Sequence, residues 1–308
     1  MVLRVSATIS VRELRKSYGS LAAVDGVSFE VEQGEFFGIL GPNGAGKTTT
    51  LEMLEGLRQP DSGTLTVLGL SPWPRNSALL PRIGVQLQAS SFFERLTVRE
   101  QIGTFASLYG VQARRAERML AVVGLDEQAD VRTEKLSGGQ AQRLSIACAL
   151  VHDPELVFMD EPTGALDPQA RRNLWDVLRQ INADGRTVVL TTHHMDEAET
   201  LCDRVAIMDH GKVLELGPPA ALVRGIDHSI RISIESGLLS AAAAAEVAAA
   251  AGSPGEATDD GVSITFATRQ PAAVLAELAN REAMAGLRVQ GATLEDVFLK
   301  LTGREYRA

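Results

Sequence analysis

The sequence predicts an α/β protein in which helices cover a mostly parallel β-sheet, followed by a small α+β domain. Short apolar runs typical of buried strands alternate with helix-forming stretches over most of the chain. One of these runs leads into a glycine-rich turn that opens a helix. After Gly217 the pattern changes to shorter strands around an alanine-rich tract, which indicates a second domain.

The expected sheet begins with residues 5–31, where apolar and polar positions alternate in two β-like runs broken near Tyr18. A helix is expected to begin at Lys47, and another at Pro168 behind the capping acid Asp167. Further strands are expected at residues 35–40, 63–68, 83–87, 155–159, 187–190 and 205–208.

A helical insert from about residue 97 to 152 interrupts this alternation. Thr97 and Glu100 have the spacing of a capping box, in which each side chain satisfies a backbone donor at the helix start. We expect one domain over residues 8–222 and a second, of α+β type, over 226–308. In the second domain, strands are expected at 228–235, 261–267 and 287–290, and helices at 238–251, 271–284 and 293–301.

Composition narrows the classes of protein. The chain has 308 residues, 45% of them hydrophobic, and a net charge of −9, which favours neither nucleic acid nor an anionic membrane as a partner. Cys148 and Cys202 lie far apart, so a disulfide framework or a zinc site is not expected. No signal peptide and no apolar run of the ~20 residues that span a bilayer is evident. We therefore expect a cytoplasmic protein that meets a membrane only through another polypeptide.

The glycine-rich turn matches the pattern GxxxxGK[ST] between a strand and a helix. Glycines let the backbone wrap a phosphate, and the helix that follows adds its positive N-terminal end. The Lys47 ammonium can reach the terminal phosphates, and the Thr48 hydroxyl is a ligand for Mg²⁺. The residues expected to bind nucleotide here are Gly41, Pro42, Asn43, Gly44, Ala45, Gly46, Lys47, Thr48 and Thr49. The pattern indicates a P-loop nucleoside triphosphatase.

Two carboxylates follow the expected strand at 155–159. Asp160 and Glu161 would lie at the carboxyl edge of the sheet, beside the P-loop. There Asp160 can hold the water shell of Mg²⁺, and Glu161 can polarise an attacking water. The alternative, an exposed acidic pair after a strand, is disfavoured by the P-loop upstream.

The segment Leu136-Ser-Gly-Gly-Gln140 supplies a second phosphate-facing helix start. Ser137 can cap a helix whose first amides, with Gly138 and Gly139, face an anion, and Gln140 completes the segment. One nucleotide needs only one helix start of each kind. The economical solution is a head-to-tail pair of chains, each completing the site of the other.

With these motifs in this order, residues 8–222 resemble the ATP-binding subunits of ABC transporters. The resemblance implies a cassette with a RecA-like parallel core, an antiparallel β subdomain and a helical subdomain. It implies an ATPase that uses ATP and Mg²⁺, forms a dimer and acts at the cytoplasmic face of the membrane with a transmembrane permease. Tyr18 stands where the family places an aromatic ring that stacks on adenine, although a core or surface tyrosine is the alternative.

The same resemblance suggests three further roles. Gln88 is similar to the glutamine that senses Mg²⁺ and the membrane partner, and its spacing favours it over Gln86. His193 matches the histidine that contacts the γ-phosphate. The segment from Gly164 to Asp167 resembles the loop that crosses the dimer interface, where Asp167 has its role. Gly164 stands where many relatives have serine, so it cannot supply a hydroxyl.

The tail gives the direction of transport. Residues 293–303 are similar to the C-terminal segment of daunorubicin- and multidrug-type exporter ATPases, which implies efflux of a drug-like, lipid or other compound. Val297, Phe298 and Leu301 form an apolar stripe that can dock on a partner or pack on its own domain. An importer ATPase is one alternative. Another is a soluble ABC ATPase acting on ribosomes or DNA, which a single cassette without long heptads or zinc cysteines disfavours.

Overall fold

The protein forms two compact units in a computed structural model, Met1–Pro219 and Ala220–Ala308. The structure describes residues 7–88, 92–93, 95–164, 166–225, 230–250 and 257–303. Residues 228–229, at the start of one expected strand, and Ala251, at the end of one expected helix, lie outside the described residues. Each unit has its own hydrophobic core.

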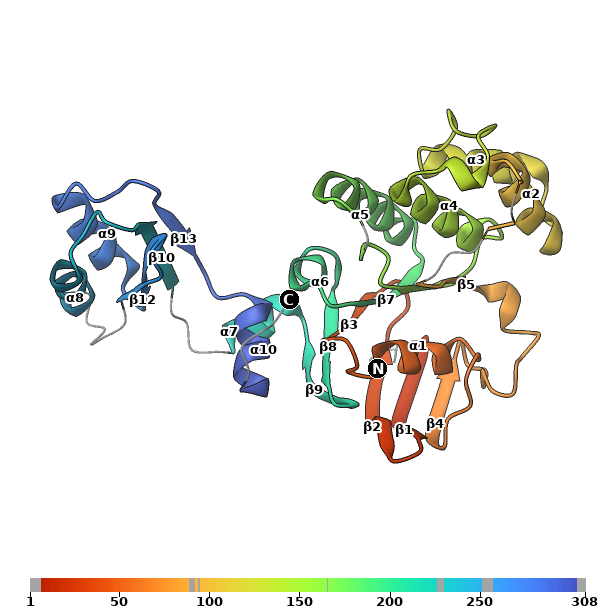
Figure 1. The fold of residues 1–308 in the computed structure, drawn as a ribbon. Coiled ribbons are helices and arrows are strands. Elements are labelled where there is room, and N and C mark those ends of the chain that lie inside the picture. Colours follow the sequence, from red (N-terminus) through yellow and green to blue (C-terminus); the bar gives the residue numbers. More distant parts are fainter. Residues whose placement is uncertain are drawn as a thin grey trace, which may run out of the picture. The chain divides into compact units, whose positions relative to one another are not determined.

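A six-stranded sheet in the order β5-β6-β7-β3-β8-β9 forms the centre of the first unit (Figure 1). Its strands are β3 (Phe36–Leu40), β5 (Ile83–Gln86), β6 (Leu156–Asp160), β7 (Thr187–Thr192), β8 (Arg204–Asp209) and β9 (Lys212–Gly217). The first five are parallel, and β9 pairs antiparallel with β8 at the edge. Every residue of β3, β6 and β7 is buried, as expected for strands covered on both faces. The predicted α/β class is therefore correct, although the sequence analysis missed β9.

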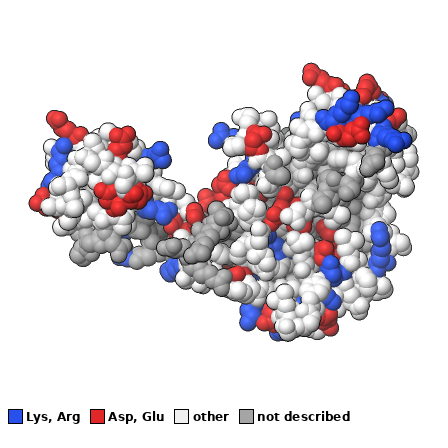
Figure 2. Space-filling model, in the orientation of Figure 1, with Lys and Arg blue, Asp and Glu red and all other residues white. Residues whose placement is uncertain are grey.

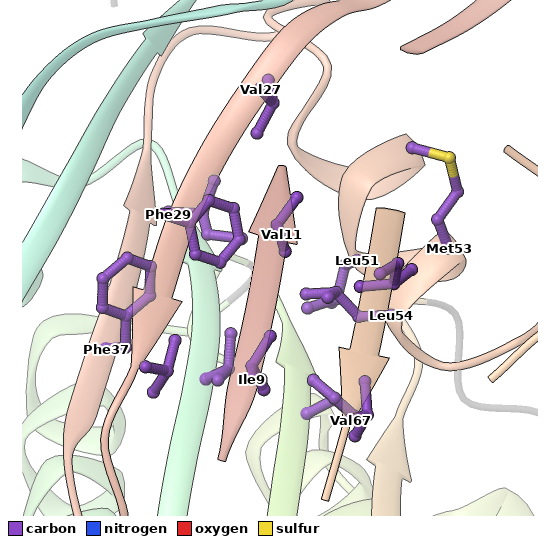
Figure 3. Packing of buried hydrophobic residues seen from close by; sticks show 14 of the residues in the cluster. Ile9, Val11, Val27, Phe29, Phe37, Leu51, Met53, Leu54 and Val67 are labelled. Carbon is purple, nitrogen blue, oxygen red and sulfur yellow. The ribbon is translucent and has the colours of Figure 1, made fainter. Parts of the chain in front are cut away.

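An antiparallel sheet in the order β2-β1-β4 packs against this centre. It contains β1 (Ile9–Tyr18), β2 (Leu21–Val31) and β4 (Ser62–Val67). Its inner face shares one core with β3 and with α1 (Lys47–Leu54), as Figure 3 shows. The rings of Phe29 and Phe37 stack with centroids 5.2 Å apart and join the two sheets. This core holds the strand that leads into the glycine-rich turn.

Five further helices lie in the described residues of the first unit. They are α2 (Val98–Leu108), α3 (Ala113–Val122), α4 (Gly138–Leu150), α5 (Pro168–Ala183) and α6 (Met195–Leu201), with short 3₁₀ turns at Leu80–Arg82 and Thr133–Lys135. The expected capping box is present, because Thr97 accepts from the Glu100 amide and Glu100 from the Thr97 amide. Charges of both signs crowd the surface over α2 and α3 (Figure 2), where Arg99 pairs with Glu117 and Asp130. These exposed pairs contribute little to stability.

The second unit contains an antiparallel sheet with the strand order β11-β12-β10-β13. Its elements are α7 (Pro219–Arg224, which begins at the boundary), β10 (Ile230–Glu235), α8 (Ala241–Ala250), β11 (Ala257–Asp259), β12 (Ser263–Thr268), α9 (Pro271–Asn280), β13 (Arg288–Gln290) and α10 (Leu294–Thr302). The order and the two helices between strands give the ferredoxin-like, split βαβ arrangement. Ile232, Phe266 and Val274 lie in its core. No helix in the described part of the chain is long and apolar enough to cross a membrane.

The stacked pair Phe29–Phe37 gives a test of the shared core. Phe37 is 0% exposed, so F37A should lower the free energy of unfolding of the first unit by about 3–5 kcal/mol. Both tryptophans, Trp73 and Trp175, belong to this unit, and their fluorescence during urea unfolding reports on it. The control L108A, at a side chain 73% exposed, should change the stability by less than about 0.5 kcal/mol. Equal effects of the two variants would contradict the assigned core.

Candidate active site

The loop between β3 and α1 depends on backbone contacts that only glycine permits. A Cβ at Gly41 would lie 2.2 Å from the carbonyl oxygen of Met208, and one at Gly46 would lie 2.3 Å from that of Ala23. Gly46 has φ 100°, in the left-handed region, and precedes α1 without a side-chain cap. The first N–H groups of α1 therefore face the loop, in the arrangement that binds phosphate.

Lys47 holds a buried ammonium in this loop. Its side chain is 4% exposed, and Nζ donates to the carbonyl oxygens of Gly41 at 2.9 Å and Pro42 at 3.2 Å. Nζ also lies 3.2 Å from Oε1 of Glu161. A buried ammonium requires such partners, because removing it from water without them is costly. The loop therefore positions one positive charge next to one of the expected carboxylates.

Asp160 lies behind Thr48 at the carboxyl end of β6. Its Oδ1 accepts a hydrogen bond from the Thr48 hydroxyl at 3.2 Å and another from the Thr191 hydroxyl on β7. Burial raises the pKa of Asp160, while these two hydrogen bonds act in the opposite direction. Hydroxyl and carboxylate oxygens are the ligands that Mg²⁺ prefers, so the Thr48–Asp160 pair fits a magnesium ion.

Glu161 follows in a backbone conformation that is rare outside glycine, with φ 45°. Its amide donates to Thr191, to the hydroxyl at 3.0 Å and the carbonyl at 3.2 Å. Oε1 lies 3.3 Å from Nδ1 of His193, and Oε2 accepts a hydrogen bond from the side-chain amide of Gln88 at 3.3 Å. Burial acts against ionisation, but Lys47 and His193 outweigh it and hold the pKa of Glu161 below its ordinary value. The carboxylate is therefore ionised and can accept a proton from water.

Seven of the residues expected to bind nucleotide line one cavity of about 510 Å³, together with Gln88 and Glu161. The expected residues in its lining are Tyr18, Asn43, Gly44, Gly46, Lys47, Thr48, Thr49, Gln88 and Glu161, and the unexpected ones are Leu21, Ala22, Ala23 and His210. Gly41, Pro42 and Ala45 belong to the loop but not to the lining. Gln86 is 1% exposed and donates to the Leu87 carbonyl, so Gln88 is the glutamine that faces the cavity.

Five of the other expected residues line a second cavity of about 320 Å³, whereas Asp160 and His193 belong to neither lining. Ser137 and Gln140 form a capping box at the start of α4, and Asp167 accepts from two amides at the start of α5. Ser137, Gly138, Gly139, Gln140 and Asp167 share this lining with Arg143, Leu166, Ala170 and Asn173. The two cavities have no lining residue in common. Ala165, within the expected interface loop, lies outside the described residues.

Besides the four unexpected lining residues, two polar residues near Asp160 were not predicted from the sequence. Thr191 bonds both Asp160 and the amide of Glu161, and its only signal was a polar pair ending the buried strand β7. Glu55, just after α1, is 3% exposed. Burial, and then the negative charges of Asp160 and Glu52, raise the pKa of Glu55 to about 8. A single acidic residue in the apolar Met53–Leu57 segment was the available signal.

Glu55 should make the stability of the protein depend on pH. Its folded pKa lies above the unfolded value, so its stabilising effect is complete below about pH 4.5 and is lost as the pH rises to about 8. We expect the wild type to lose up to about 4 kcal/mol more than E55Q over this range. Urea unfolding of both proteins without nucleotide, at half-unit steps of pH, measures the difference. Parallel curves for the two proteins would show that Glu55 titrates normally.

Comparisons with known proteins agree with this geometry. Residues 24–164 match the family model described as ABC transporter. The Nod factor export ATP-binding protein I of Ralstonia nicotianae is 41% identical over 97% of this chain and 95% of its own length, and that of Rhizobium sp. is 40% identical over 96% and 97%.

Solved structures agree as well. The chain is similar to cbiO1 from Clostridium perfringens, part of the ABC transporter complex cbiONQ, with a TM-score of 0.66, 28% identity and coverage of 71% of this chain and 91% of that one. Subunits of this kind bind ATP, generally with Mg²⁺, and work with a separate transmembrane component. From its motifs, its fold and its full-length relatives, this chain belongs to the ABC transporter family, as an ATP-binding subunit.

Proposed function

We propose that this chain hydrolyses Mg·ATP between two copies arranged head to tail, and that hydrolysis drives export through a separate transmembrane permease. The placement of the two phosphate-facing helix starts carries the proposal. α1 begins at the cavity that contains Lys47, and α4 begins at a cavity that contains Ser137, with no residue shared between the linings. Two copies facing each other bring one start of each kind to each nucleotide. Asp167, which lines the second cavity, would lie at the same interface.

The chemistry follows from the contacts of Lys47 and Glu161. Glu161 is now the anionic partner of Lys47, because its Oε1 lies 3.2 Å from the Lys47 Nζ. A γ-phosphate that reaches this ammonium would replace Glu161 as that partner. The released Glu161 carboxylate can then orient a water and take its proton. His193, 3.3 Å from Glu161, would contact the same phosphate from the end of β7. Tyr18, 42% exposed at the cavity rim, offers a ring for adenine.

Mg²⁺ would be held by the Thr48 hydroxyl and, through water, by Asp160 and Gln88. When bound, it neutralises part of the triphosphate charge. Gln88 lines the nucleotide cavity, and its side-chain amide donates to Oε2 of Glu161 at 3.3 Å. A change at the phosphate can therefore alter the position of the segment that carries Gln88.

A groove next to this segment supports a link to the membrane component. It has a volume of about 280 Å³ and contains Leu87, Phe105 and Tyr109 in a mainly apolar lining. Leu87 adjoins Gln88 in the chain and is 48% exposed. An apolar helix of the permease fits such a groove. The chain would thus work at the cytoplasmic face of the membrane, held there by its partner.

Two observations support export as the direction. Residues 293–303 are similar to the C-terminal segment of daunorubicin- and multidrug-type exporters, and α10 forms over them with Val297 and Phe298 buried. The full-length relatives are named as export proteins. We propose a drug-like or lipid-like compound as the cargo, selected by the permease. An importer would instead require a solute-binding partner.

Glu161→Gln tests the proposed reaction. The variant should lose ATP turnover by at least about 100-fold, because the amide cannot take the proton from water, yet it should accumulate as an ATP-bound dimer. Steady-state phosphate release and light scattering after size exclusion measure the two effects. The control E117Q removes an exposed carboxylate over α3 and should behave as wild type. Monomeric and inactive protein in all three samples, also with the co-expressed permease, would refute the proposal.

Lys47 and Ser137 give a second test, of the two-copy site. K47A removes the ammonium within the binding chain, so ATP affinity should fall by at least about tenfold. S137A removes a group that acts only on the nucleotide of the partner copy, so it should keep ATP affinity and lose turnover. Titration with a fluorescent ATP analogue, beside a turnover assay, separates the two. An equal loss of affinity in both variants would indicate that one chain forms the whole site.

A further inference from the structure

A buried carboxylate outside the nucleotide cavity connects the segment that follows Glu161 to the segment that follows His193. Glu197 lies in α6 and is 0% exposed. Its Oε1 accepts hydrogen bonds from the Thr163 hydroxyl at 2.9 Å and from the Trp175 indole N–H at 3.1 Å. Burial raises the pKa of Glu197, and the hydrogen bonds from the Thr163 hydroxyl and from Trp175 oppose this effect. One carboxylate on α6 therefore binds side chains of two other segments, the loop after β6 and α5.

Two of these segments carry the residues expected to act on ATP. Thr163 lies two residues after Glu161, and Glu197 itself lies four residues after His193. The Thr192 hydroxyl accepts a hydrogen bond from the His194 amide at 3.0 Å, which closes the turn around His193 ahead of α6. Glu197 thus connects the segments that carry the two expected reacting groups.

A separate connection joins the end of β7 to the β6 loop. Thr191 bonds Asp160 and the amide of Glu161. Successive residues of a strand point to opposite faces of the sheet, so Thr192 is directed away from these bonds. The β6 loop is consequently connected to β7 directly through Thr191, and to α6 through the bond between Glu197 and Thr163.

This second connection is needed because the β6 loop is strained. Glu161 has φ 45°, a conformation that a residue other than glycine keeps only when its surroundings determine it. Thr163 is 1% exposed, and its hydroxyl bond to Glu197 fixes the chain two residues beyond that point. If Glu197 could not accept this bond, Glu161 could relax and move away from Nδ1 of His193, now 3.3 Å from its carboxylate.

We propose that Glu197 is a positioning residue that sets the separation of Glu161 and His193 by holding Thr163, which follows Glu161, against the helix that follows His193. The proposal rests on the proposed function, in which both groups act in ATP hydrolysis. It assigns to Glu197 an effect on the rate of the chemical step and not on nucleotide affinity, because Glu197 lies outside the lining of both cavities.

The experiment compares E197L, E197Q, T163V and W175F in the full-length chain. E197L and T163V remove the connection to the β6 loop, and both should lower kcat by about tenfold to 100-fold, since a misplacement of 1 Å has such an effect. KM for ATP should stay within about threefold of wild type. The double variant T163V/E197L should be no slower than E197L, because the two changes break the same interaction.

Two variants separate positioning from simple loss of packing. E197Q keeps an oxygen that can accept from Thr163, so it should recover a large part of kcat. W175F removes a donor from the same buried carboxylate but lies in α5, away from Glu161 and His193 in the chain. It should keep kcat within about twofold of wild type, even where its thermal stability falls as much as that of T163V.

Either of two results overturns the proposal when the wild type is active. One is an unchanged kcat in E197L, measured well below its unfolding temperature, and the other is an equal loss of kcat in W175F. A wild type without turnover refutes the proposed hydrolysis instead. The imidazole resonances of His193 then decide the positioning role, since they should move in E197L and T163V and stay in W175F. Unchanged resonances in all three overturn it without reference to turnover.

Discussion

The Lys47 ammonium is a buried positive charge, and most of the candidate active site consists of the groups that surround it. Two carbonyl groups of the glycine-rich loop and the Glu161 carboxylate are its partners. A buried ammonium without them would be strongly unfavourable. The carbonyls can converge only because Gly41 packs directly on the Met208 backbone. The carboxylate reaches Lys47 from a backbone conformation that is itself unfavourable for glutamate. The charge, the loop and the strained turn are therefore parts of one interaction.

The hydrophobic core keeps this interaction in place. β3 carries the loop and is buried at every residue, and α1, which follows the loop, packs between the two sheets (Figure 3). Phe29 on β2 and Phe37 on β3 stack across the junction of the sheets. A shift of the antiparallel sheet, whose strand β2 packs on the loop at Gly46 through Ala23, would move the loop relative to β6 and β7, where Asp160 and Thr191 lie. Close packing makes such shifts costly, so the polar site has the rigidity of the apolar core beneath it.

Three buried carboxylates and the half-buried Glu161 lie near the ends of β6 and β7 and differ in their environments. Burial raises the pKa of Glu55, Asp160 and Glu197, whereas Lys47 and His193 lower that of Glu161 below its ordinary value. Only Glu161 combines a low pKa with a place in the nucleotide cavity. Different neighbours thus suit one kind of group to the proposed roles of base, metal ligand and positioning residue. The second cavity, around Ser137, contains none of them.

The sequence by itself determined the fold class, most strands and helices, and the residues of the two phosphate-facing helix starts. These features depend on local patterns: apolar runs, capping residues, and glycines next to Lys47 or Ser137. β9 was not predicted because it is a partly exposed edge strand without an uninterrupted apolar run. The spacing already favoured Gln88 over Gln86, and the tertiary structure places Gln88 in the cavity lining. Only the tertiary structure revealed Glu55, Thr191 and Glu197. Their positions result from contacts between segments far apart in the chain, and no local pattern records which buried polar group meets which.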